Sequence, residues 1–265
     1  MRESKVKSSG ECISEIPDGA SILIGGWGPI RKPMVLLKEL LKSSIKDLTI
    51  MTYGGMDLDL LLGAGKVKKA IYGFVSFEGA PGSPGNFRRA RQDNIVEMRE
   101  LSEYLFICGL KAAAERLPFY PTRSGLGTDI LTVNPEMKMI EDPYTGEKLI
   151  AMPAMTPDIA LIHVNEADHL GNGRILGDPF LDRLFVRAAK KTILSAEKIL
   201  PSGSIQKSTI LSPWVDVVVE APGGAWPGSC YPDYEIDEKE FKRYGEAAAT
   251  LESFQKYLSE CCQGG

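Results

Sequence analysis

The chain has 265 residues, of which 43% are hydrophobic and 25% are charged. This is an ordinary globular composition, and it excludes a disordered or fibrous chain. The balance of 31 Lys and Arg residues against 35 Asp and Glu residues gives a net charge of −4, which argues against a nucleic-acid partner. No secretory signal or stretch of ~20 apolar residues is visible, so we expect a cytoplasmic protein with no membrane partner.

The cysteines fit that compartment. There are five, at positions 12, 108, 230, 261 and 262, which is an odd number without the density of a disulfide scaffold. We expect Cys108 in the core, and Cys261 and Cys262 as surface thiols. No pair has CxxC spacing and there are only two histidines, so the sequence predicts no metal site.

Apolar periodicity alternates between strand-like and helix-like segments along the chain. In chain order we predict strand 21–24, helix 33–42, strand 48–51, helix 58–64, strand 70–75, helix 103–116, strand 159–164, helix 179–190, strand 192–195, strand 215–219, and C-terminal helices 238–249 and 251–261 near 238–261. Strands followed by helices predict an α/β fold, with an open, mostly parallel sheet covered by helices on both faces. We expect one domain over 1–265, with a loop-rich insertion near 134–147.

Three glycine clusters follow strand-like segments, where open α/β sheets bind ligands. They are Gly25, Gly26 and Gly28, then Gly54 and Gly55, then Gly125 and Gly127. Each could be a tight turn, but together they predict a cleft lined by backbone. The chain lacks a complete dinucleotide fingerprint, a phosphate loop, HExxH and GxSxG, which disfavours the usual NAD and ATP enzymes.

An ordered set of motifs resembles the A (alpha) subunits of family I coenzyme A transferases. They are Asp18-Gly19, Gly25-Gly26-Trp27-Gly28 with Arg31-Lys32-Pro33-Met34, the segment 117–128, and the segment 157–172. Residues 219–234 are most similar to the glutaconate CoA-transferase alpha branch. That branch includes the alpha subunit of a steroid ring-opening CoA hydrolase, which segments 51–55, 65–68, 72–76 and 116–127 resemble closely.

The resemblance implies the CoA-transferase and sugar-isomerase-like superfold and an acyl-CoA substrate, with coenzyme A as a substrate moiety and no separate cofactor. In the family, the thioester is attacked by a glutamate of the B subunit, in a Glu-(Asn/Ser)-Gly context. This chain has no such motif, so the resemblance implies that its partner is a homologous beta (B) subunit. The expected function is the alpha subunit of a heteromeric CoA-transferase. A ring-opening acyl-CoA hydrolase subunit, a noncatalytic scaffold and, less favoured, a sugar-phosphate isomerase relative are the alternatives.

Glu103 and Arg123 are the predicted catalytic residues. Glu103 begins the strongest helix after Ser102, and in the similar hydrolase subunit the corresponding acid acts on water. It could instead be a first-turn acid favoured by the helix dipole, and Glu97 and Glu100 remain competitors. Arg123 precedes the Gly125 turn, where it could orient a substrate carboxylate or a CoA-thioester product, or simply lie on the surface.

Other charged residues carry weaker predictions. Arg31, next to Lys32, could contact the CoA phosphates or merely flank a helix start. His163 lies in an apolar strand pattern, which is more typical of a core or interface histidine than of a catalyst. His169, in a turn, is a weak candidate.

Overall fold

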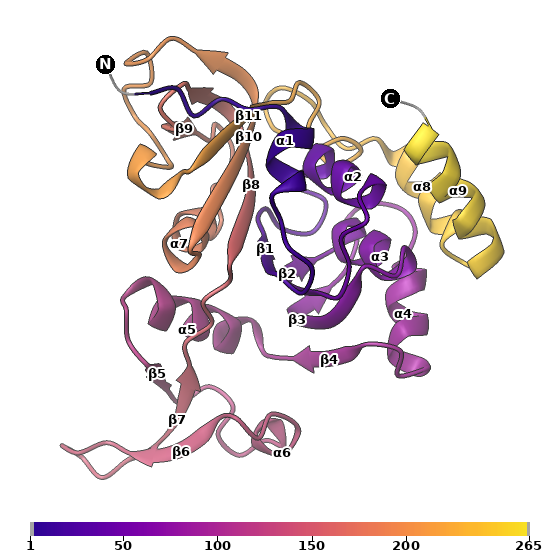
Figure 1. The fold of residues 1–265 in the computed structure, drawn as a ribbon. Coiled ribbons are helices and arrows are strands. Elements are labelled where there is room, and N and C mark those ends of the chain that lie inside the picture. Colours follow the sequence, from indigo (N-terminus) through magenta and orange to yellow (C-terminus); the bar gives the residue numbers. More distant parts are fainter. Residues whose placement is uncertain (1–2, 264–265) are drawn as a thin grey trace.

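One sheet of eight strands forms the centre of the computed structural model, which describes residues 3–263 (Figure 1). The strand order is β11-β10-β8-β1-β2-β3-β4, all parallel, and β9 pairs with β8 antiparallel. The strands are β1 Ser21–Ile24, β2 Leu48–Gly54, β3 Val67–Val75, β4 Glu97–Glu100, β8 Ile159–Asp168, β9 Gly173–Arg174, β10 Lys191–Leu200 and β11 Val217–Glu220.

Helices cover both faces of this sheet, each over its own apolar cluster (Figure 1). One face carries α1 Ser9–Ser14, α2 Met34–Lys42, α3 Met56–Gly63, α4 Gly85–Gln92, α8 Glu238–Ala247 and α9 Leu251–Gln263, and the other carries α5 Glu103–Ala114 and α7 Asp182–Ala188. The predicted α/β fold with an open, mostly parallel sheet is confirmed. Every predicted strand and helix overlaps an observed one, whereas α1, α4 and β4 were not predicted.

The strand order reverses next to β1. The chain runs outward through β2, β3 and β4 on one side of β1, and through β8, β10 and β11 on the other. Such a switch point opens a crevice at the carboxyl ends of the strands, because the connections leave β1 and β8 in opposite directions. The residues after β1 and β8 are therefore the first place to look for a ligand site.

A second, antiparallel sheet projects from the main body as an arm, which we define as residues 117–153 (Figure 1). Its order is β5-β7-β6, with β5 Phe119–Thr122, β6 Lys138–Glu141, β7 Lys148–Pro153 and the short helix α6 Ile130–Val133. The prediction of a loop-rich insertion near 134–147 is wrong in part, because β6 and β7 form a hairpin there. Only the turn from Asp142 to Glu147 is irregular.

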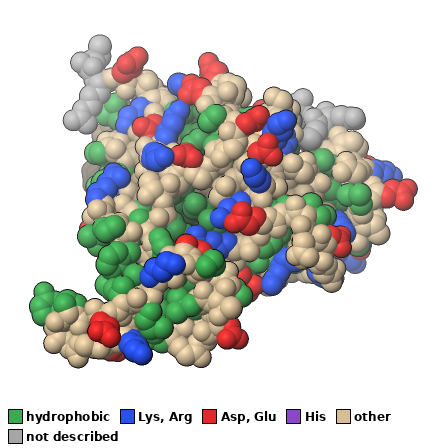
Figure 2. All heavy atoms as spheres, turned by 60° about the horizontal axis from the view of Figure 1, so that its bottom comes forward, with side chains coloured by type: hydrophobic (Ala, Val, Ile, Leu, Met, Phe, Trp, Pro, Cys, Tyr) green, Lys and Arg blue, Asp and Glu red, His purple; other side chains and the backbone are tan. Residues whose placement is uncertain are grey.

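The arm exposes large apolar side chains. Tyr144 is 94% exposed and Val133 is 68% exposed, and Leu117, Phe119 and Met139 are also exposed. Figure 2, in which the arm comes forward at the bottom, shows hydrophobic side chains gathered over it. Large apolar patches on a protein surface commonly mark interaction sites.

Other sequence-based expectations can be checked in the same structure. Cys108 is fully buried, as predicted. Cys261 is half-buried against Tyr257 rather than freely exposed, and the side chain of Cys262 lies outside the described residues. Within residues 3–263, no helix has both the length and the apolar character needed to cross a membrane.

Candidate active site

The turn after β1 forms one side of the switch-point crevice. Gly26 adopts a left-handed backbone with φ of 71°, and a Cβ there would lie 2.3 Å from the Ile30 carbonyl oxygen. Only glycine fits this turn, because both the conformation and the space exclude a side chain. The turn presents Trp27, whose ring packs 5.1 Å from that of Phe180 in the loop before α7.

These aromatic rings form the walls of a cavity of about 300 Å³ at the switch point. It is lined by Gly26, Trp27, Tyr53, Glu103, Ile107, Phe180, Leu181 and Phe185. Residues from β2, α5 and the start of α7 thus meet the turn after β1. Ligand sites are typically apolar cavities of this size with a few convergent polar groups.

Glu103 provides the carboxylate among the residues that line this pocket. It begins α5, where the Ser102 hydroxyl caps the helix by accepting from the Leu105 amide at 3.2 Å. The Tyr53 hydroxyl donates to the Glu103 carbonyl oxygen at 2.8 Å, and burial, followed by the nearby Glu103 charge, raises the pKa of Tyr53. Among the described residues, no group bonds to the Glu103 carboxylate itself, so it is free to act on a ligand.

The structure separates Glu103 from its two competitors. Glu97 pairs with Lys69 at 2.5 Å and Glu100 pairs with Arg91 at 2.9 Å. Neither lines the pocket. The position at the end of a capped helix, not the density of acids along 97–103, places one carboxylate in the crevice.

The first two glycine clusters support the pocket from behind. A Cβ on Gly55 would lie 2.8 Å from the Gly28 carbonyl oxygen, so the turns after β1 and β2 are in contact. Gly25 and Gly54 are buried in the same turns. Of the predicted binding glycines, Gly26 is the one that lines the pocket.

Arg123 lies beside the pocket, on the arm. Its guanidinium makes two hydrogen bonds of 2.5 Å to the Glu147 carboxylate, and its side chain is 71% exposed. The next residue, Ser124, has its hydroxyl 3.2 Å from that of Ser102, so the arm meets the start of α5. Gly125 and Gly127 shape this turn without lining the pocket. Sequence reasoning missed Glu147 as the partner, since it is 24 positions away.

Arg31 has a different place from the one predicted. Its side chain is 1% exposed and its guanidinium is bonded to Asp182 at 2.5 Å, so it has no free face for a CoA phosphate. Lys32 is buried as well and bonds to the Tyr53 carbonyl oxygen at 2.7 Å. The alternative that they support the local structure fits these contacts.

His163 is a satisfied core histidine, as its strand pattern predicts. With Glu197 and Cys230 it forms a buried cluster of possible metal ligands. Both of its ring nitrogens are engaged, one 2.9 Å from the Ser195 hydroxyl and one 2.7 Å from Glu197, and burial lowers its pKa. A metal would have to displace these bonds. His169 is exposed in the turn after β8 and does not line the pocket.

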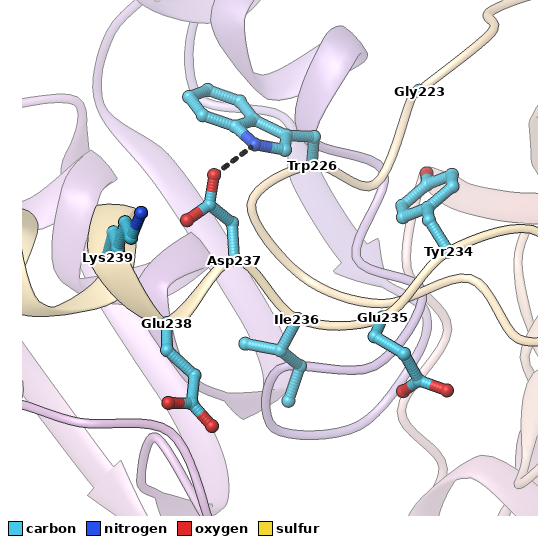
Figure 3. Close-up of a pocket in the computed structure, with 8 residues that line it drawn as sticks. All are labelled: Gly223, Trp226, Tyr234, Glu235, Ile236, Asp237, Glu238 and Lys239. Atoms are coloured by element: carbon cyan, nitrogen blue, oxygen red, sulfur yellow. Dashed lines mark hydrogen bonds between the residues drawn. The ribbon is translucent and has the colours of Figure 1, made fainter.

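A larger and more open hollow of about 920 Å³ lies between residue 223 and the start of α8 (Figure 3). Figure 3 shows Trp226 donating to Asp237, with Glu235 and Glu238 pointing away from each other. It contains none of the predicted catalytic residues, and its acids do not converge on one point. The smaller pocket, with an apolar wall and one free carboxylate, is the better candidate for chemistry.

The family model of coenzyme A transferase matches residues 6–221. The chain therefore belongs to this family of enzymes, as an alpha-type subunit.

It is similar to several named relatives. It is 41% identical to the cholesterol ring-cleaving hydrolase IpdA subunit of Rhodococcus jostii (strain RHA1), covering 99% of this chain and 93% of the relative. It is 33% identical to the first of the two glutaconate CoA-transferase subunits of Acidaminococcus fermentans, covering 97% of this chain and 87% of the relative. The crystal structure of that transferase matches with a TM-score of 0.92, 32% identity, and 97% and 88% coverage of the two chains. A structure of the decarboxylase AibA/AibB matches with a TM-score of 0.88 and 29% identity, covering 98% of this chain and 100% of that one.

Proposed function

We propose that the chain is the alpha subunit of a two-subunit enzyme that opens the ring of a cyclic acyl-CoA by hydrolysis. The observation that carries the proposal is the free Glu103 carboxylate in a pocket walled by aromatic and aliphatic side chains. The walls suit an alicyclic acyl group, and the carboxylate supplies a base. The 41% identity to a ring-cleaving hydrolase subunit supports the same reading.

The proposed reaction uses Glu103 as a general base. Glu103 takes a proton from water while the hydroxide oxygen bonds to a ring carbonyl carbon. The bond from that carbon to its α-carbon then breaks, and its electron pair passes into the neighbouring carbonyl as an enolate. The proton held by Glu103 returns to the α-carbon. One water is consumed, and one carboxylate is formed.

Arg123 serves this reaction as an anion-binding group. A guanidinium binds a carboxylate in a bidentate manner, as Arg123 already does with Glu147. Exchange of Glu147 for a substrate carboxylate or enolate would bring Arg123 into the site beside Glu103. The Ser102–Ser124 contact keeps the two segments adjacent.

The partner is a homologous beta subunit, because the relatives are named as subunits of heteromeric enzymes. The exposed apolar side chains of the arm provide a surface for such a partner. We propose no cofactor besides the CoA moiety of the substrate. Turnover should therefore survive exhaustive chelation, and a strict requirement for a divalent ion or NAD would contradict the proposal.

The test is Glu103→Gln in the purified two-subunit complex. Loss of a general base typically costs 10²–10⁴-fold, so kcat should fall by about that factor. The matched control is Glu100→Gln, which removes an acid three residues away that pairs with Arg91 outside the pocket. Undiminished turnover by Glu103→Gln, or an equal loss in both variants, would remove the hydrolase assignment.

CoA transfer is the second candidate, and the family match and the similarity to glutaconate CoA-transferase favour it. In this reaction the nucleophilic glutamate belongs to the partner. Hydroxylamine or borohydride should then trap a glutamyl-CoA thioester on the partner, and Glu103→Gln should cost much less. A Glu-(Asn/Ser)-Gly motif in the partner's sequence would favour transfer.

A further inference from the structure

Two adjacent cationic residues, Arg31 and Lys32, lie buried behind the walls of the Glu103 pocket. Their side chains are 1% and 3% exposed. Arginine and lysine are seldom buried unless every charge is paired, and such pairs are weak sources of stability. Their contacts show what they join.

Arg31 joins the turn after β1 to the start of α7. Its guanidinium donates to Asp182 at 2.5 Å and to the Asp178 carbonyl oxygen at 2.7 Å. The other oxygen of Asp182 accepts from the Gly26 amide at 3.0 Å. The joined segments carry Trp27 and Phe180, which face each other across the pocket wall.

Lys32 reaches the end of β2 instead. Its ammonium donates to the Tyr53 carbonyl oxygen at 2.7 Å and lies 3.1 Å from Asp57, which also accepts from the Gly55 amide. Tyr53 lines the pocket and its hydroxyl bonds to the backbone of Glu103. Lys32 thus holds a second wall, through the residue that contacts the catalytic helix.

Backbone conformation provides an independent observation. Arg31 and Phe180 both have left-handed backbones, with φ of 51° and 43°. Such conformations are strained in residues with side chains, and they persist where the surroundings fix them, often at functional sites. Here they occur at the two ends of the Arg31 contact.

We propose that Arg31 and Lys32 are positioning residues that fix the pocket walls around the acyl group. Arg31 fixes the Trp27–Phe180 wall, and Lys32 fixes Tyr53. The assignment of an acyl group to the pocket rests on the proposed function, whereas the effect on the walls does not.

The test follows Trp27 directly. The chain is labelled with 5-fluorotryptophan, assembled with its unlabelled partner, and the Trp27 resonance is assigned with Trp27→Phe. The variant Arg31→Met/Asp182→Leu replaces the whole ion pair with apolar side chains, which usually preserves folding. Arg31→Lys tests conservative rescue. Asp59→Asn is the control, since Asp59 is a buried carboxylate bonded to Tyr244 and Asn86 away from the pocket.

The double variant should shift or broaden the Trp27 resonance and weaken binding of the probe cyclohexanecarbonyl-CoA about tenfold. Arg31→Lys should lie between it and the unmodified chain, and Asp59→Asn should change neither. A folded double variant with an unchanged Trp27 resonance would overturn the proposal. If the probe fails to perturb Trp27 in the unmodified complex while the double variant still shifts that resonance, the positioning role stands and the proposed function fails.

Discussion

The Glu103 pocket and the β5–β7 arm meet at Ser102 and Ser124, yet they are built in opposite ways. The pocket lies at the carboxyl edge of a buried parallel sheet, and its walls are held by buried bonds such as that of Arg31 to Asp182. The arm is a three-stranded antiparallel sheet with exposed apolar side chains and an exposed ion pair. The comparison indicates that the pocket is complete within this chain, whereas the arm is completed by something else.

The largest expected effect comes from removing the partner. The solitary chain should show no measurable turnover, because the arm that carries Arg123 lacks the surface that covers it. The measurement is acyl-CoA turnover by the chain alone and after addition of the protein encoded beside it. Full activity of the chain alone would break the contrast between a complete pocket and an incomplete arm.

Core substitutions should separate the two regions next. Phe106 is fully buried beneath the pocket, with its ring 5.0 Å from that of Tyr53. Phe106→Ala should lower the free energy of unfolding by about 3–5 kcal/mol, because it leaves a cavity. Met139→Ala on the arm should change it by about 0.5 kcal/mol or less, since Met139 is half exposed. Urea unfolding of the isolated chain measures both, and a similar cost at the two positions would contradict the contrast.

The same contrast explains what could be predicted from the sequence. The start of α5 at Glu103 was predicted to the residue, because Ser102 and Glu103 are a local cap signal. The fold class followed from strands that are apolar on both faces. In the arm, β5 contains Pro121 and pairs with β7 across some thirty residues, so no local periodicity marks it.

Buried electrostatic contacts were equally hidden. Arg31 and Asp182 are 151 positions apart, and nothing in the Arg31-Lys32 dipeptide distinguishes a buried pair from a phosphate-binding one. The glycines were placed correctly at strand ends, but only Gly26 among them lines the pocket. Sequence patterns thus locate the edge where a ligand binds, whereas the three-dimensional structure decides which side chains face it.

Arg123 allows a sharper test of the arm's role. Arg123→Met should lower kcat/KM about 30-fold, equivalent to ~2 kcal/mol, if its guanidinium binds a substrate anion in the complex. Glu147→Gln removes its competitor, and it should leave kcat/KM unchanged or raise it. Steady-state kinetics of the complex provide the values. Equal losses in the two variants would mean that the Arg123–Glu147 pair is merely structural.

The smallest expected effect distinguishes glycines that shape a turn from glycines that line a site. Gly127 has φ of 74° and a Cβ added there would meet no atom within 4 Å, so Gly127→Ala is strained but not crowded. It should cost about 1 kcal/mol of unfolding free energy, the penalty of a left-handed backbone, without changing KM. Gly26→Ala adds the 2.3 Å approach to Ile30, so it should cost more and raise KM. Urea unfolding and kinetics of both variants check this. A raised KM in Gly127→Ala would place the arm's turn in contact with substrate, and would extend the site beyond the Glu103 pocket.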